Sequence, residues 1–248
     1  MASTRPKLTG QDLSDLAGLV RVLEDNPSFT RTLADSTSPL AARQNLADQV
    51  LSATGPVARA ELTAGIGRTA SGEGLAQWLR DRLIASAWAW ADQSGHLTEV
   101  ADQVFAFSRT LLADRDLRWA LVDRQADADR RRALVESLTA GLLPASAALI
   151  QACVAAPGGT LDARLRACVE VGAELSGARL ATVTVARRLD EAQRRRLTSA
   201  LVERFATPVV LEEIVDPTVL GGVRVECGAD VVDATVTSRL EAARRAIA

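Results

Sequence analysis

Side chains that catalyse reactions or bind metals are sparse in this sequence of 248 residues. The single histidine, His96, follows Gly95, which excludes a site with two His ligands and favours a solvated loop position. Cys153 and Cys168 lie in apolar stretches, and together with Cys227 they form no C-x-x-C pair. These contexts predict buried, unreactive thiols. We therefore expect no catalytic residue, no metal site and no cofactor.

Charged clusters offer no better site. Glu212 and Glu213 are adjacent in an expected strand, so their side chains point to opposite faces and cannot share one substrate. We expect one at the strand edge and one on the surface. The arginine runs 130–132 and 194–196 have Asp and Glu nearby in expected helices, which favours a solvated helix face over a docking patch for an acidic partner.

Tryptophan is the aromatic residue with the clearest clustering. Trp78, Trp88 and Trp90 fall within a short stretch, and Trp88 and Trp90 are two positions apart, so they cannot share one helix face. Core packing accounts for Trp78 and for one of the pair. The other is a candidate partner contact, because Trp is enriched at binding hot spots, and we keep both Trp88 and Trp90 as candidates.

Composition excludes several classes of protein. The net charge is −2, the pI is about 5.6 and Tyr is absent, which disfavours nucleic acid as a partner. Three cysteines leave one unpaired, so a disulfide framework is not expected and a reducing cytoplasm fits best. Residues 1–10 have no apolar core of a signal peptide, and the nearly apolar run 83–91 is shorter than the ~20 residues of a membrane span.

The order of expected elements defines the fold class. Up to about Ser176, apolar residues recur at spacings of three and four, which predicts a succession of helices. Strands are expected only afterwards, at 180–185, 209–215 and 223–226. We predict a mainly α protein with a C-terminal α/β part, in which an N-terminal helical bundle precedes a small mixed sheet with helices.

Gly221 and Gly222 stand between the second and third expected strands. No Lys-Ser or Lys-Thr follows them and the chain continues as a strand, so they do not form a phosphate-binding loop. We expect that the backbone needs a positive φ or a close approach there.

The helical part resembles two copies of one unit. A shift of 88 positions aligns identical residues in the same order of helices and breaks, namely Arg21 with Arg109, Leu23 with Leu111, Leu33 with Leu121, Asp35 with Asp123, Arg43 with Arg131, Leu46 with Leu134 and Pro56 with Pro144. A chance match of amphipathic patterns is the alternative. We predict a first helical repeat at 1–95, a second at 96–177 and a C-terminal α/β domain at 178–248.

The segment 209–228 carries a family resemblance. The segment follows a pattern of an apolar strand, an acidic residue, an aliphatic residue, Gly-Gly and an alternating strand that ends near Gly. The residues at these positions are Val209, Leu211, Val215, Asp216, Val219, Gly221, Gly222, Val223, Val225 and Gly228. This pattern resembles the C-terminal signature of the ATP synthase delta subunit family, which includes the mitochondrial oligomycin-sensitivity-conferring protein. Residues 180–185 with 189–193 resemble its first strand and helix entry, and 231–236 with Arg239 and Leu240 resemble its last segment.

The resemblance implies structural roles for five residues: Asp216, Gly221, Gly222, Gly228 and Asp233. Asp233 matches the first residue of the Asp-Gly-Ser that the family usually has, whereas Ala234 and Thr235 depart from it. The duplicated helical region makes this an enlarged form.

A functional hypothesis follows from the resemblance. It implies a non-catalytic stator connector of the rotary proton-translocating ATP synthase, which supports ATP synthesis. Its partners would be the N-terminal helix of an alpha subunit and the b-type stalk subunits, and the extra helical copy would add contact with the stalk or the head. It implies a peripheral place on the cytoplasmic face of the cell membrane, with membrane association only through the complex. A helical RNA-binding or regulatory adaptor is the alternative, which the acidic pI disfavours.

Overall fold

The computed structural model describes residues 7–52, 54–123, 127–236, 240 and 244. The chain separates into two compact units, Met1–Cys168 and Val169–Ala248, here called the helical unit and the sheet unit. Helices dominate the first and a four-stranded mixed sheet lies in the second, which confirms the predicted fold class. Both predicted helical repeats fall largely within the helical unit, and the three-part division at 95 and 177 remains a proposal.

The helices up to the start of the sheet follow one another with short connections. Proline at the first position starts several of them, where its missing N–H has no intrahelical partner to lose. Their bounds are α1 (Gly10–Asp25), α2 (Pro27–Ala34), α3 (Leu40–Val50), α4 (Pro56–Arg68), α5 (Gly72–Ser94), α6 (Leu97–Ala113), α7 (Arg115–Val122), α8 (Ala128–Thr139), α9 (Pro144–Ala155) and α10 (Leu161–Leu175).

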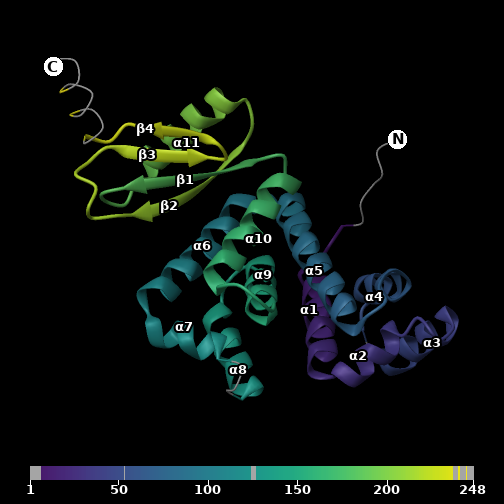
Figure 1. Cartoon of the computed structure of the whole chain (residues 1–248). Coiled ribbons are helices and arrows are strands. Elements are labelled where there is room, and N and C mark those ends of the chain that lie inside the picture. The colour runs from purple at the N-terminus through teal and green to yellow at the C-terminus, as the bar shows by residue number, and fades with distance from the viewer. Residues whose placement is uncertain (1–6, 53, 124–126, 237–239, 241–243, 245–248) are drawn as a thin grey trace. The chain divides into compact units, whose positions relative to one another are not determined.

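Helix α5 forms the centre of the helical unit. Ser71 caps its first turn, and Gly95 ends it in the left-handed conformation with φ of 74°. Helices α1, α2, α4, α6 and α9 all pack against it (Figure 1). Leu75, Leu79 and Leu83 on this helix are almost fully buried. The apolar faces of the neighbouring helices are therefore buried against one helix, α5.

The helix bounds repeat along the chain. Helices α7, α8 and α9 begin 88 residues after α2, α3 and α4. The residue that follows α2, Asp35, has φ of −66° and ψ of 102°, and its counterpart Asp123 after α7 has φ of −65° and ψ of 107°. The two segments therefore leave their short helices in the same conformation.

A paired arginine contact also recurs. Arg43 donates from Nη1 to the carbonyl oxygen of Leu33 at 3.2 Å, and Arg131 donates from Nη1 to the carbonyl oxygen of Asp123 at 2.9 Å. Each guanidinium thus meets the carbonyl end of the preceding short helix, where a cation is favoured by the helix dipole. These recurrences support the proposal of a duplicated helical region.

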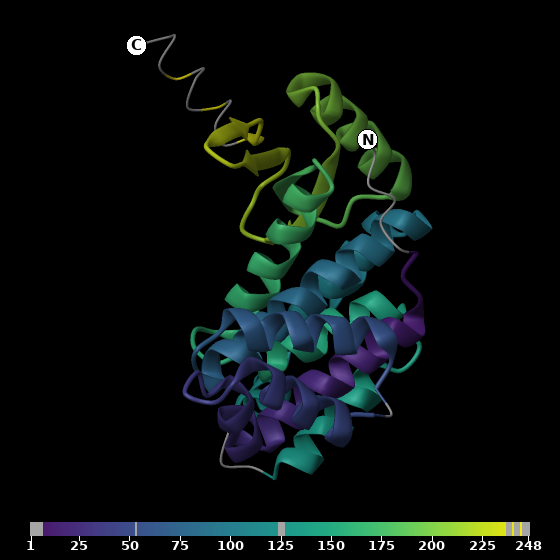
Figure 2. The same ribbon diagram turned by 90° about the vertical axis from the view of Figure 1, so that its right-hand side faces the viewer.

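The sheet unit has strand order β2-β1-β3-β4. Its elements are β1 (Arg179–Val185), α11 (Glu191–Phe205), β2 (Val209–Val215), β3 (Val223–Cys227) and β4 (Asp230–Asp233). Strand β1 is parallel to β2 and antiparallel to β3, and β3 is antiparallel to β4. Helix α11 connects the two parallel strands and packs on one face of the sheet, as the turned view shows (Figure 2). The expected strands and the expected helix entry at 189–193 are confirmed.

Glu213 departs from the expectation of an edge or surface residue. Its side chain is buried, and Oε1 accepts a hydrogen bond from the backbone N–H of Leu189 at 3.1 Å. Glu212 instead accepts from Thr182 Oγ1 at 2.8 Å. The expectation was wrong for Glu213 because the loop between β1 and α11 folds over its face of the strand.

The Gly221-Gly222 turn confirms the expected backbone requirement. The φ values are 152° and 84°, and the Gly221 carbonyl accepts from Val236 N–H at 3.0 Å. A Cβ on Gly222 would lie 2.4 Å from the carbonyl oxygen of Ala234, closer than real contacts. Gly222 therefore allows the segment after β4 to continue alongside β3.

Replacement of Gly222 tests this close approach. We expect Gly222→Ala to lower the free energy of unfolding of the sheet unit by about 3 kcal/mol, because strain and a backbone clash add. Gly228→Ala is the matched control, since Gly228 also has positive φ but its Cβ would meet only an ordinary contact at 3.4 Å. It should cost about 1 kcal/mol. Urea unfolding monitored by hydrogen exchange of β1 and β3 amides measures both, and equal losses would contradict the role of the close approach.

Candidate functional site

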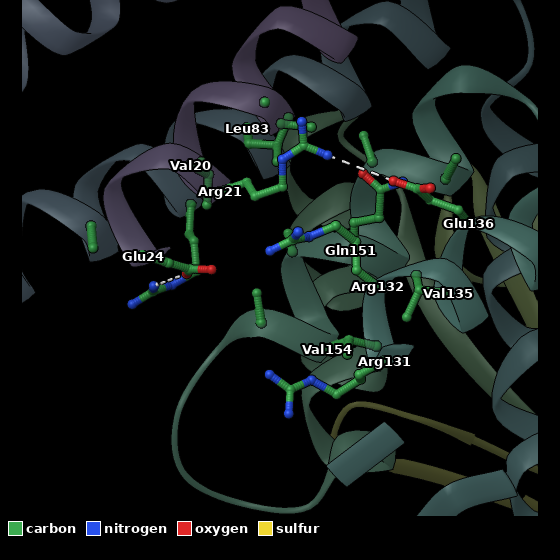
Figure 3. Close-up of a pocket in the computed structure, with 18 of the residues that line it drawn as sticks. Val20, Arg21, Glu24, Leu83, Arg131, Arg132, Val135, Glu136, Gln151 and Val154 are labelled. Atoms are coloured by element: carbon green, nitrogen blue, oxygen red, sulfur yellow. Dashed lines mark hydrogen bonds and ion pairs between the residues drawn. The ribbon is translucent and has the colours of Figure 1, made fainter. Parts of the chain in front are cut away.

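A groove of about 1040 Å³ opens in the helical unit between α1, α5, α8 and α9 (Figure 3). Small side chains line much of it, among them Ala17 and Gly18 on α1 and Ala148 and Ala152 on α9. An added Cβ on Gly18 would meet no heavy atom within 4 Å, so this stretch of α1 faces open space.

Ion pairs along the groove connect the two predicted repeats. Arg21 on α1 lies 3.6 Å from Glu136 on α8, and Arg132 on α8 lies 2.7 Å from Asp25 at the end of α1. Figure 3 shows the Arg21 to Glu136 pair beside the opening. Such exposed pairs stabilise a fold by less than about 1 kcal/mol each, but they fix the orientation of charge at a rim.

A buried arginine forms part of the inner wall. Arg80 on α5 is 4% exposed, and its guanidinium contacts Glu24 on α1 through Nη1 and Gln77 through Nη2 at 2.9 Å. Its Nε has no hydrogen-bond partner among the residues that the structure describes. Paired burial of this kind holds α1 against α5, because removal of one partner would leave an uncompensated charge.

The arginine run 130–132 belongs to this site rather than to a purely solvated face. Arg131 and Arg132 both line the groove, and Arg131 extends from its wall in Figure 3. Arg130 is exposed and lies 3.9 Å from Asp127. The run 194–196 in α11 agrees with a solvated face at Arg195, which pairs with Glu191 at 3.3 Å.

The structure separates the two tryptophans that the sequence keeps as candidates, with one in the core and the other half-buried. Trp88 is 2% exposed and donates from Nε1 to the carbonyl oxygen of Cys168 at 2.9 Å, so it cannot serve as a partner contact. Trp90 is half-buried and stacks on His96 with ring centroids 6.0 Å apart, and it stays a candidate. Trp119 on α7 is 71% exposed and was missed, because one Trp in a short amphipathic helix gives no sequence signal of exposure.

Cys153 and Cys168 are buried, as the sequence predicts, and Cys227 is buried as well. A hydrogen bond with Cys153 and burial raise the pKa of Cys168 well above its ordinary value. Burial also raises the pKa of Cys227. Thiols held protonated in this way are poor nucleophiles, which agrees with the expectation that they are unreactive.

Two of the expected structural residues share a turn motif. Asp216 accepts from the N–H of Thr218 at 2.9 Å and from its hydroxyl at 2.7 Å. Asp233 makes the same two contacts with Thr235, at 2.9 and 2.7 Å. Side-chain and backbone hydrogen bonds from these threonines hold the pKa of both aspartates below the ordinary 3.8. Thr235 thus makes a polar contact where the family usually has Ser.

Exposed apolar side chains lie on either side of the Gly221-Gly222 turn. Val215 ends β2, Leu220 precedes the glycines and is 77% exposed, and Val236 follows β4. Gly228 occupies the two-residue turn between β3 and β4 with φ of 60°. Arg239, which belongs to the segment that resembles the last segment of the family, lies outside the described residues.

The groove has a form that suits a partner-binding adaptor. An open groove suits a docked helix, and no group of three or more potential metal ligands occurs among the described residues. In the same part of the chain, no helix is long and apolar enough to cross a membrane.

Comparisons with known proteins identify the family. A family model described as ATP synthase delta (OSCP) subunit matches residues 85–247. An ATP synthase subunit delta from Beutenbergia cavernae is 35% identical, with 96% of this chain and 91% of the relative covered. Those from a Nocardioides species and Streptomyces avermitilis are 33% and 32% identical, each covering 94% of this chain, with 86% and 87% of the relatives covered. The chain belongs to the ATP synthase delta (OSCP) subunit family.

The extent of the matches bears on the enlarged N-terminus. The family model begins inside α5, so α1 to α4 precede it. The three relatives nevertheless cover 94 to 96% of the chain. Most of the sequence that precedes the family model in this chain therefore aligns with these relatives as well.

The Asp216 turn provides a test by titration. Loss of the hydroxyl in Thr218→Val should raise the pKa of Asp216 toward 3.8, because the side-chain hydrogen bond is the largest cause of its lowered pKa. A lowered carboxyl pKa stabilises the fold above pH 3.8, and this contribution is lost as the pH falls below that value. The variant should therefore lose less stability on acidification. Carboxyl NMR titration measures it with Asp233 as the internal control, and an unchanged Asp216 pKa would refute the assigned cause.

Proposed function

We propose that this chain is the delta subunit of the rotary proton-translocating ATP synthase and acts as a non-catalytic connector in the peripheral stalk. It joins the alpha and beta catalytic head to the b-type stalk and so supports proton-driven ATP synthesis. The main support for this proposal is an open groove of about 1040 Å³ in a chain whose relatives are named ATP synthase subunit delta.

The connector must resist torque. Rotation of a central shaft would turn the head unless a tether holds it, and this requires contacts that dissociate slowly. The N-terminal helix of an alpha subunit is the proposed occupant of the groove. Small, half-buried residues such as Gly18 and Ala147 allow its backbone to approach closely, and the apolar face of an amphipathic helix would be buried along α1 and α9.

The sheet unit is the proposed contact for the b-type stalk. Val215, Leu220 and Val236 expose apolar surface beside a turn that Gly222 and the Asp216 hydrogen bonds hold in place. Side chains fixed in this way lose little entropy on binding. Membrane association would come only through the complex, on the cytoplasmic face.

An RNA-binding adaptor is less well supported. Two of the groove arginines, Arg21 and Arg132, are paired with carboxylates, and the net charge of the chain is −2. Phosphate binding depends on uncompensated positive charge. The groove therefore favours a peptide helix.

Blocking the groove tests the proposed occupant. Gly18→Trp should weaken binding of a peptide from the alpha-subunit N-terminus by at least about tenfold, because an indole would occupy the space above α1. Gly67→Trp is the matched control, since Gly67 is an exposed helical glycine outside the groove whose Cβ would meet only one atom, at 4.0 Å. Isothermal titration calorimetry on the folded full-length variants measures both.

Unchanged affinity in folded Gly18→Trp would place the alpha helix elsewhere. The connector role itself is tested separately, by gentle solubilisation of membranes and purification of the tagged chain. Stoichiometric recovery of head and b-type subunits supports the role, and recovery of the chain alone or with RNA would refute it. Deletion of one repeat is a poorer test, because α1 packs on both α5 and α9.

A further inference from the structure

Two thiols meet inside the helical unit. Cys153 on α9 and Cys168 on α10 are each 3% exposed. The Cys153 thiol donates to the carbonyl oxygen of Arg164 at 3.6 Å, and Arg164 precedes Cys168 by four residues, on the same face of α10. A second hydrogen bond joins Cys153 to the Cys168 thiol and, together with burial, raises the pKa of Cys168. We call Cys153 and Cys168 the thiol pair.

The segment between the two cysteines contributes to the groove. Val154, Gly158 and Arg164 all line the groove, and Arg164 Nη1 donates to the carbonyl oxygen of Gly158 at 2.6 Å. A covalent bond between the members of the thiol pair would close this segment into a ring of about 15 residues. It would also hold α9 to α10 at a point where the thiols now make only non-covalent contacts.

Cys227 provides the contrast within the chain. It is the third of three cysteines and lies in β3 of the sheet unit, where the sequence has no other cysteine. A single oxidised thiol adds oxygen stepwise, whereas an oxidised thiol beside a second thiol condenses with it to a disulfide. The thiol pair therefore has a crosslinked product that Cys227 lacks.

We propose that the thiol pair is a site of reversible oxidation, at which hydrogen peroxide joins Cys153 and Cys168 in a disulfide. The Cys153 sulfur attacks one peroxide oxygen, the O–O bond breaks, and the hydroxide that leaves takes up the Cys153 proton as water. Cys168 then attacks the sulfenic sulfur of Cys153, the S–O bond breaks, and a second water carries away the Cys168 proton. Two electrons pass from the thiol pair to the peroxide, and a small dithiol returns two electrons on reduction.

The surroundings favour a disulfide over a charged product. The raised pKa of Cys168 keeps this thiol protonated, so Cys153 is the sulfur that attacks first. A disulfide carries no charge, which suits a buried position better than a sulfinate does. Burial keeps large thiol reagents away, so the reaction is slow and proceeds when α10 opens locally from α9. The thiols are thus unreactive in the closed fold and are reached by a small oxidant.

The disulfide has a consequence for the groove, and this part alone rests on the proposed function. Ala152 and Val154, the neighbours of Cys153, line the groove. A crosslink to α10 restricts the motion of this wall, and a surface fixed in advance loses less entropy on docking. We expect a labelled alpha-subunit peptide to dissociate about threefold more slowly from the oxidised chain than from the reduced chain in stopped-flow fluorescence.

Disulfide mapping on the full-length chain tests the proposal. The reduced chain is treated with hydrogen peroxide, its remaining thiols are blocked with N-ethylmaleimide after unfolding, and tryptic peptides are identified without reduction. Trypsin cleaves after Arg164 and Arg166, so Cys153 and Cys168 fall on separate peptides that a disulfide would join. We expect the joined peptides in most of the oxidised chain and their separation by dithiothreitol, while Cys227 carries the blocking group or added oxygen.

Alanine variants provide the matched controls. Cys227→Ala should give the same yield of joined peptides, whereas Cys153→Ala should give none and leave Cys168 to add oxygen. The oxidised wild-type chain and oxidised Cys227→Ala should have a Tm roughly 5–10 °C above that of their reduced forms, because a loop of about 15 residues is closed. Cys153→Ala should show no such rise. An unchanged Tm in the crosslinked chain would contradict closure of this segment.

The remaining outcomes separate this inference from the proposed function. Recovery of Cys153 and Cys168 as free thiols or sulfinic acids, or in disulfides with Cys227 or with a second copy, would overturn the proposal. The crosslink is measured without any partner, so its absence in a chain that binds the alpha-subunit peptide refutes the thiol pair alone. A crosslinked chain that fails to bind the peptide would refute the docking groove, and equal dissociation rates from both forms would refute the effect of the disulfide on it.

Discussion

Burial of α5 is the constraint on which the helical unit depends. This helix has 23 residues, about 34 Å of length, and its apolar side chains meet neighbours on several sides. A helix in such a position must satisfy every polar group that it buries. Trp88 does so by donating to the Cys168 carbonyl, and Arg80 does so largely through Glu24 and Gln77. These contacts join α5 to α10 through Trp88 and to α1 through Arg80.

The groove is a consequence of that packing. Helix α1 comes from the first predicted repeat and α8 and α9 from the second, so the groove exists only where the repeats meet. Small residues on α1 and α9, among them Gly18 and Ala147, leave part of this space. The pairs of Arg21 with Glu136 and of Arg132 with Asp25 then connect its sides. A connector that transmits force benefits from a site held on several helices at once.

The sheet unit is stabilised by local contacts in its turns more than by a large core. Its hydrophobic core is small, with Val183, Leu201 and Val225 among its members, and its turns are fixed by local contacts. Gly222 permits a close backbone approach, and Asp216 and Asp233 each accept two hydrogen bonds from a threonine. Close packing and short turns therefore hold the exposed apolar residues in defined positions, which lowers the entropic cost of docking.

Local patterns in the sequence determined the elements of this protein. The β-branched run 209–215, the glycines after Asp216 and the 88-residue spacing of helix breaks all depend on residues close in the chain, so the strands, the turn and the repeated helix order could be predicted. Exposure depended on which distant helix covers a residue. Trp88 and Trp119 both lie in helices with apolar neighbours, yet Trp88 is buried and donates to the Cys168 carbonyl of α10, whereas Trp119 is exposed. Likewise, the groove joins residues near 18 with residues near 148, and the burial of Glu213 depends on a loop that folds back. Tertiary packing alone decided the exposure of the tryptophans, the groove and the burial of Glu213. Burial is a property of contacts between elements and not of the residue or its neighbours in sequence.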